Sequence, residues 1–183
     1  MDVNFTYQAP GKVDPVRIEQ VFAEKPGGGL VANSEFDILP TTAVGEDGDK
    51  FKPIKAYRLT KAVSTGDSTI QIEKGSGVAV GDVIAYGTKG VACTKVDTSK
   101  DEYDEVTVSL GTEIPNDTVL YQAKAASDDN AEPIYKPKYV TGNVVPGNAG
   151  DFLVRLINGA NLRKETACIA DEVAELLPQI TLV

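Results

Sequence analysis

Short runs in which apolar and polar residues alternate dominate the middle of the chain. Ile70 and Ile72 alternate with polar neighbours, and the same period of two recurs at Val106 and Val108. Such a period is typical of half-buried β-strands. The runs are bounded by Gly, Asp, Asn, Ser or Pro and follow one another roughly every 8–12 residues. We therefore predict a small antiparallel β-barrel or sandwich over residues 56–124.

The segments on either side of residues 56–124 have a less regular pattern of apolar and polar residues. Residues 1–33 carry scattered Pro and Gly without a sustained hydrophobic period, and we predict an extended N-terminal arm there, with residues 17–24 as either a helix or a strand. Residues 34–44 are predicted to form a strand that ends at Pro40, and residues 45–53 a turn-rich loop. Residues 34–55 together with residues 125–183 are predicted to form a second, β-rich body.

One helical pattern stands near the C-terminus. Ile169, Val173 and Leu177 fall on one face at a spacing of four residues, and Pro178 follows them. This predicts a helix over about residues 161–177, followed by a short terminal strand. The expected fold class is therefore mainly β, and α+β overall.

Composition and charge narrow the function classes. The chain has 183 residues, 42% of them hydrophobic, which suffices for a buried core, and its formal net charge is −9. An acidic protein is repelled by nucleic-acid phosphates and by anionic membranes, so we expect neither as a partner. No apolar run is long enough for a transmembrane helix, and the first residues do not resemble a signal peptide, so we expect no membrane span and no Sec-dependent export.

The histidine and cysteine content limits which catalytic, zinc-binding and disulfide sites the chain can form. The sequence contains no histidine, which removes the usual general base of serine and cysteine hydrolases and the commonest zinc ligand. Cys93 and Cys168 are the two cysteines, too few for a disulfide framework. We expect both to be reduced, buried thiols.

The segment KGSGVAVGDVIAYG, residues 74–87, resembles a phosphate-binding loop at first sight. Gly75, Gly77 and Gly81 are one residue too widely spaced for the dinucleotide-binding fingerprint, and a β-branched run follows them rather than a helical pattern. A helix N-terminus to hold phosphates is therefore missing. We predict a strand, a turn and a second strand, with the glycines supplying positive φ angles.

Three further groups of side chains are candidates for reactivity. Alternating acidic oxygens can bind calcium, but a solvated turn is the favoured interpretation of Glu46, Asp47 and Asp49. Clustered carboxylates can serve acid–base catalysis, but a turn between strands is favoured for the acidic segment, which contains Asp97, Asp101, Glu102, Asp104 and Glu105. A Schiff-base role needs a desolvated pocket, which the sequence does not indicate around the candidate lysines, Lys61, Lys89 and Lys95. We therefore predict no catalytic, cofactor-binding or metal-binding residues.

Three stretches carry a resemblance to a known family. Residues 72–84 (IEKGSGVAVGDVI), residues 95–123 (KVDTSKDEYDEVTVSLGTEIPNDTVLYQA) and residues 153–183, which include VRLINGANLRKETACIADEVAELLPQITLV, occur in this order. The combination resembles the head fiber or head decoration proteins of tailed bacteriophages, especially those of prophages in gut bacteria. The matching stretches make up under half of the chain, and the arm does not share the resemblance.

The resemblance implies a non-enzymatic virion protein that is made in the bacterial host cytoplasm and binds the outer capsid surface. Its partner would be the phage major capsid protein, and such proteins are often homotrimers. The family has no catalytic residues to carry over. Two alternatives remain open: a carbohydrate- or cell-surface-binding β-module, and an enzyme that uses the carboxylates of residues 97–105.

Overall fold

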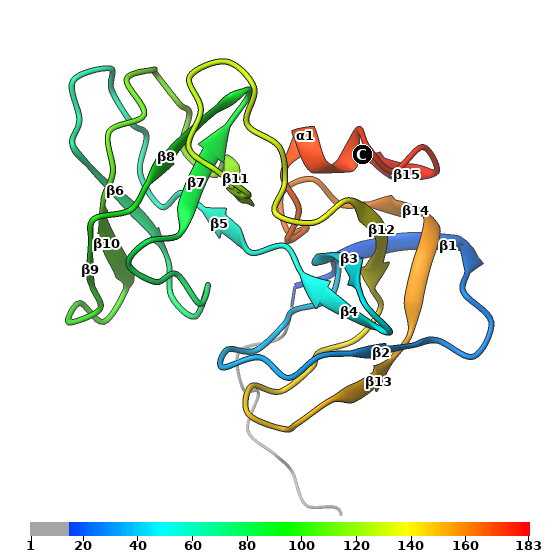
Figure 1. Ribbon diagram of the computed structural model, residues 1–183. Coiled ribbons are helices and arrows are strands. Elements are labelled where there is room, and N and C mark those ends of the chain that lie inside the picture. The colour runs from blue at the N-terminus through cyan, green and yellow to red at the C-terminus, as the bar shows by residue number, and fades with distance from the viewer. Residues whose placement is uncertain (1–14) are drawn as a thin grey trace, which may run out of the picture.

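The computed structural model describes residues 15–183 and has two β-rich lobes (Figure 1). Within these residues the first lobe is one eight-stranded sheet in the order β1-β14-β12-β3-β4-β2-β13, with β15 added beside β14. Its strands are β1 (Ile18–Glu24), β2 (Gly29–Val31), β3 (Ala43–Asp47), β4 (Lys50–Pro53), β12 (Pro137–Thr141), β13 (Phe152–Val154), β14 (Leu156–Leu162) and β15 (Ile180–Leu182). All neighbouring strands are antiparallel except the pairs β2–β4 and β14–β15.

The sheet of the first lobe curls into a barrel-like shape. β13 ends the sheet order, yet only Arg155 separates it from β14 near the other end of that order. The sheet therefore curves so that its last strand, β13, comes close to β14. The concave side holds an apolar cluster whose buried members are Val31, Ile38, Val44, Phe51, Val145, Val154 and Leu156.

The second lobe corresponds to the segment with the alternating pattern. Its described strands form a four-stranded sheet, β5-β11-β7-β8, and a three-stranded sheet, β6-β10-β9. The strands are β5 (Ala56–Arg58), β6 (Thr69–Glu73), β7 (Val83–Tyr86), β8 (Lys89–Ala92), β9 (Lys95–Asp97), β10 (Tyr103–Thr107) and β11 (Val119–Ala123). Ile70, Ile72 and Val106 are buried in a shared cluster, as a period of two requires. The predicted mainly β fold is confirmed; its barrel-like part is the curled sheet of the first lobe, while residues 56–124 form two sheets around one shared core.

The chain crosses between the lobes twice, through Ile54 and Lys55 and again through residues 124–136. A third apolar cluster lies against the convex side of the curled sheet. It joins Val140 and Ile157 of the first lobe to Ala85 and Tyr121 of the second. The segment after β14 completes this cluster, so the lobes share part of their core.

The C-terminal helix is far shorter than predicted. The α-helix α1 spans only Asp171–Ala174, and Asn161 and Leu162 belong instead to β14. Those two residues pair with β1 on one side and with β15 on the other. Two flanking strands satisfy the backbone of Asn161 and Leu162, so the predicted start of the helix is strand instead, and residues 163–170 form turns and bends.

The N-terminal part also differs from the predictions. Residues 15–33, the described part of the expected arm, contribute β1 and β2 to the sheet, while residues 1–14 lie outside the described residues. The predicted loop at residues 45–53 is a hairpin of β3 and β4, with Gly48 at a φ of 68° in the turn. In residues 34–44 the strand starts only at Ala43, beyond Pro40.

Candidate functional site

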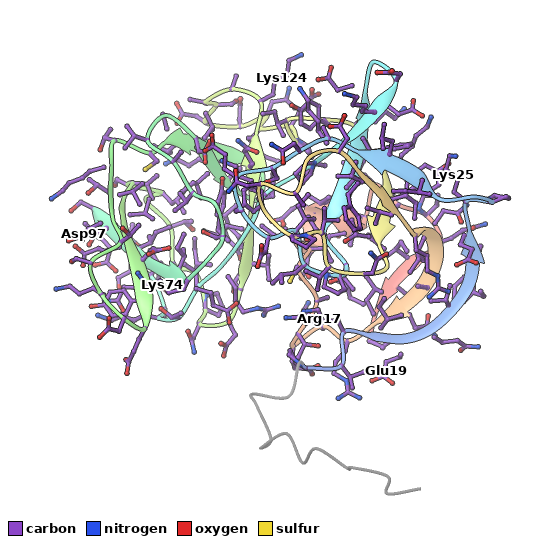
Figure 2. All side chains as sticks on the ribbon, turned by 90° about the horizontal axis from the view of Figure 1, so that it is seen from below. Arg17, Glu19, Lys25, Lys74, Asp97 and Lys124 are labelled. Atoms are coloured by element: carbon purple, nitrogen blue, oxygen red, sulfur yellow. The ribbon has the colours of Figure 1, made fainter. Side chains whose placement is uncertain are left out.

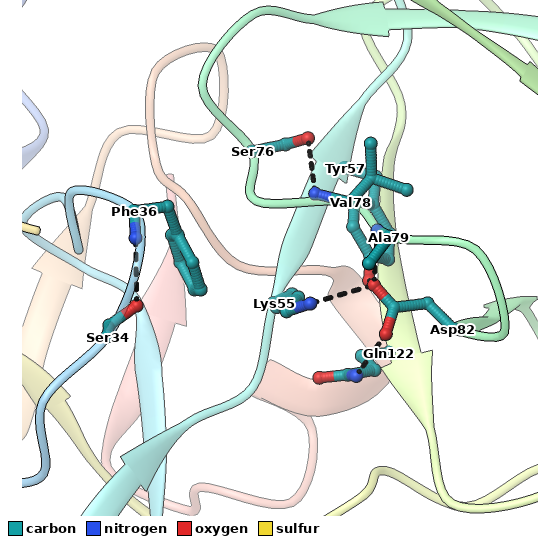
Figure 3. Close-up of polar contacts among 9 residues, drawn as sticks. All are labelled: Ser34, Phe36, Lys55, Tyr57, Ser76, Val78, Ala79, Asp82 and Gln122. Carbon is teal, nitrogen blue, oxygen red and sulfur yellow. Dashed lines mark hydrogen bonds and ion pairs between the residues drawn. The ribbon is translucent and has the colours of Figure 1, made fainter. Parts of the chain in front are cut away.

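A cluster of buried polar side chains lies where the second lobe meets the first. The carboxylate of Asp82 accepts hydrogen bonds from Lys55 Nζ (2.8 Å), Tyr57 OH (3.1 Å), Gln122 Nε2 (3.0 Å) and the backbone N–H of Ala79 (2.9 Å) (Figure 3). Three of these donors meet Oδ2, and Gln122 meets Oδ1. We call this cluster the Asp82 junction.

The junction joins segments that are far apart in the sequence. Lys55 lies in the first connection between the lobes, Tyr57 on β5, and Gln122 on β11 just before the second connection. Asp82 itself follows the glycine-rich turn and precedes β7. One carboxylate therefore fixes the first connection, strands β5 and β11 and the turn against each other.

Burial makes the charges of the junction interdependent. The Lys55 side chain is 17% exposed and that of Asp82 12%. A charge removed from water in this way is tolerated only with a partner of opposite sign and filled hydrogen bonds. Burial, and next the negative charge of Asp82, raise the pKa of Tyr57 well above its ordinary value, so the phenol stays a proton donor.

The glycine-rich turn of residues 74–81 has a structural reason for its glycines. Gly75, Gly77 and Gly81 all have positive φ angles. At Gly77, the ring of Phe36 from the first lobe occupies the place of a side chain, because a Cβ there would lie 2.3 Å from ring carbons. The turn leads into β7 and not into a helix, which confirms the predicted strand–turn–strand.

A cleft of about 490 Å³ opens beside the Asp82 junction. Phe36 and Tyr135 lie along its wall, together with Lys52, Lys55 and Gln122. The ammonium of Lys55 lies 5.6 Å from the centroid of the Phe36 ring, and that of Lys52 lies 5.9 Å from the centroid of the Tyr135 ring. The cleft thus combines aromatic surface with fixed polar groups.

The acidic segment of residues 97–105 does not converge on one catalytic pair. Asp97 and Glu105 are cross-strand neighbours on β9 and β10, whereas Asp104 faces the opposite side of the sheet. Asp104 is buried and paired with Lys74 Nζ at 2.8 Å. Figure 2 shows Asp97 at the side of the second lobe away from the first.

The predicted turn at Asp97 is confirmed. Its Oδ1 accepts a hydrogen bond from the backbone N–H of Ser99 at 3.0 Å, which is an Asx turn. Hydrogen bonds from Ser99 lower the pKa of the Asp97 carboxyl. The group is therefore stabilised as a carboxylate.

The other reactive candidates lie on the surface or in ion pairs. Asp47 pairs with Lys52 and Glu46 with Lys138, both at 2.5 Å. Within residues 15–183, no three His, Cys, Asp or Glu side chains are placed to hold a metal ion. Of the candidate lysines, Lys61 and Lys95 are exposed and Lys89 is partly buried.

The sequence did not single out Lys55, the lysine that pairs with Asp82 and whose side chain is 17% exposed. Its residue type and its neighbours, Ile54 and Ala56, carry no local signal for an ionic contact. Its partner Asp82 lies 27 residues further along the chain.

Both cysteines are free thiols, as predicted. Cys93 is buried, and Cys168 is partly buried next to the seam between the lobes. Burial is the largest cause that raises the pKa of each thiol. The nucleophilic thiolate is therefore disfavoured at both positions.

We expect both thiols to resist alkylation in the folded protein. At pH 8 the raised pKa leaves less thiolate than in an exposed cysteine, and burial also limits access to the reagent. Iodoacetamide labelling followed by intact-mass measurement should show slow modification of the native protein and rapid double modification in guanidinium chloride. Rapid labelling of Cys168 in the native state would contradict its burial.

The chain was compared with protein families, curated proteins and solved structures, and none of the three comparisons finds a match. Within residues 15–183, no helix is long and apolar enough to span a membrane.

Proposed function

We propose that this protein is a non-enzymatic structural component of a tailed-phage virion, bound to the outer capsid surface as a head decoration or head fiber protein. The proposal includes the phage major capsid protein as partner and a homotrimer as the assembly. It rests on the resemblance of residues 72–84, 95–123 and 153–183. It also rests on the hydrogen bonds and ion pairs that carboxylates form inside the fold.

The main structural support is the Asp82 junction. Four donors converge on this carboxylate, three from the second lobe and Lys55 from the connection to the first lobe, so its hydrogen bonds tie that connection to the second lobe. Asp104 is similarly occupied by Lys74, whose Nζ also donates to the carbonyl of Thr98 at 2.6 Å. Buried carboxylates in this chain thus act as cross-links. A lobe that is cross-linked internally and to the connection leading into it suits a protein whose task is mechanical.

Capsid binding would draw on several weak contacts at once. In a trimer, three copies of one surface engage the capsid together, and avidity exceeds the affinity of each contact. We propose that the first lobe and the segment before it face the capsid, and that the second lobe projects outward.

The proposal is tested in the bacterium that encodes the chain. Phage particles are induced, purified on a density gradient and analysed by quantitative mass spectrometry. We expect the protein in the particle fraction at a fixed ratio to the major capsid protein. Its deletion should yield particles without it that remain assembled but are less resistant to heat. Production of the protein without its presence in purified particles would overturn the proposal.

A further inference from the structure

The cleft beside the Asp82 junction contains a hydrogen-bond acceptor that is held in place without a partner. Gln122 is only 8% exposed, and its Nε2 is fixed by Asp82. Among residues 15–183, no donor bonds its Oε1, which is not one of the fully buried unpartnered atoms and is therefore accessible from the cleft. Figure 3 shows this oxygen on the side of the amide turned away from Asp82. A buried amide with one end fixed presents its other end in a defined direction.

Other groups around the cleft could complete the recognition of a polar ligand. The Oγ of Ser34 accepts a hydrogen bond from the backbone N–H of Phe36 at 3.3 Å, which leaves its proton free to donate. Lys52 has further N–H groups besides the one directed at Asp47. The Glu35 side chain adds an acceptor, and Tyr135 adds aromatic surface.

The charges of the cleft favour a neutral ligand. Lys52 and Lys55 are each already paired with an aspartate, so little positive charge remains for an anion. The protein as a whole carries −9, which further disfavours anions. Because both lysines are paired, the wall offers a cation only the exposed carboxylate of Glu35.

We propose that the cleft binds a neutral saccharide. Sugar hydroxyls both donate and accept, which matches the mixture of Gln122 Oε1, Ser34 and Lys52, and the C–H faces of a sugar can contact Tyr135. The volume of about 490 Å³ lies within the range of small-molecule sites. Binding would add a glycan-recognition activity that does not depend on the virion role proposed above.

The test uses the full chain and a defined panel of probes. Saturation-transfer difference NMR is recorded with glucose, galactose, N-acetylglucosamine, maltose, cellobiose, lactose and chitobiose, each at 10 mM. We expect at least one disaccharide to give a signal, with a Kd in the millimolar range or below by titration. No signal from any of the seven probes would overturn the proposal.

A matched pair of variants localises the binding. Lys50 and Lys52 both lie on β4, and each pairs with an aspartate, but Lys52 lines the cleft whereas Lys50 pairs with Asp151 outside it. We expect Lys52→Ala to weaken saccharide binding at least fivefold and Lys50→Ala to leave it unchanged. Gln122→Met, checked for folding by circular dichroism, should weaken binding at least tenfold. Equal binding by all variants would place the saccharide elsewhere and overturn the assignment.

Discussion

Replacing Asp82 with alanine is expected to lower the free energy of unfolding by about 3–5 kcal/mol, because the buried ammonium of Lys55 then loses its partner. The donors on Tyr57 and Gln122 lose their acceptor in the same step. A loss of this size is a large fraction of the stability of an ordinary domain. Urea unfolding followed by circular dichroism measures it directly.

Two control variants separate the cost of leaving the Lys55 charge unpaired from a nonspecific loss of stability. Asp47→Ala removes an exposed ion pair on the surface hairpin, and we expect a change of at most about 1 kcal/mol. Lys55→Met combined with Asp82→Ala removes both charges, and the double variant should be more stable than Asp82→Ala alone. If it is not, the stability of the junction does not come from its ion pair.

The Asp82 junction also illustrates what could be predicted from the sequence. The strands at Thr69–Glu73 and Tyr103–Thr107 were predictable because each has one face in the core, and this imposes a period of two on the sequence. The Asx turn at Asp97 was predictable because the interaction spans only two residues. Features set within one element or one turn leave a local pattern.

Strand pairing and side-chain contacts between residues far apart in the sequence leave no local pattern of this kind. The helix predicted over residues 161–177 starts only at Asp171, because Asn161 and Leu162 pair with β1 and β15 and residues 163–170 form turns and bends. The hairpin at residues 45–53 was hidden because its exposed residues are charged and its turn is rich in Gly and Asp. In the junction, Lys55 and Gln122 lie 27 and 40 residues from Asp82, so only the fold brings them together.

Replacing Gly77 with alanine is expected to lower the free energy of unfolding by about 2–4 kcal/mol, from two separate causes. The φ of 70° is a left-handed conformation, which costs an alanine roughly 1–2 kcal/mol. The new Cβ would also lie 2.3 Å from the Phe36 ring, which has to leave its place at the seam. Thermal and urea unfolding of the variant provide the measurement.

Gly75→Ala is the matched control, because Gly75 has a similar φ of 79° but no atom within 4 Å of the position that a Cβ would take. It should show the backbone cost of roughly 1–2 kcal/mol alone. A double-mutant cycle of Gly77→Ala with Phe36→Ala isolates the steric part. Once the ring is gone, Gly77→Ala should cost no more than Gly75→Ala. If Gly77→Ala costs the same with and without the ring, Phe36 does not hold the turn, and the glycine is required for its backbone conformation alone.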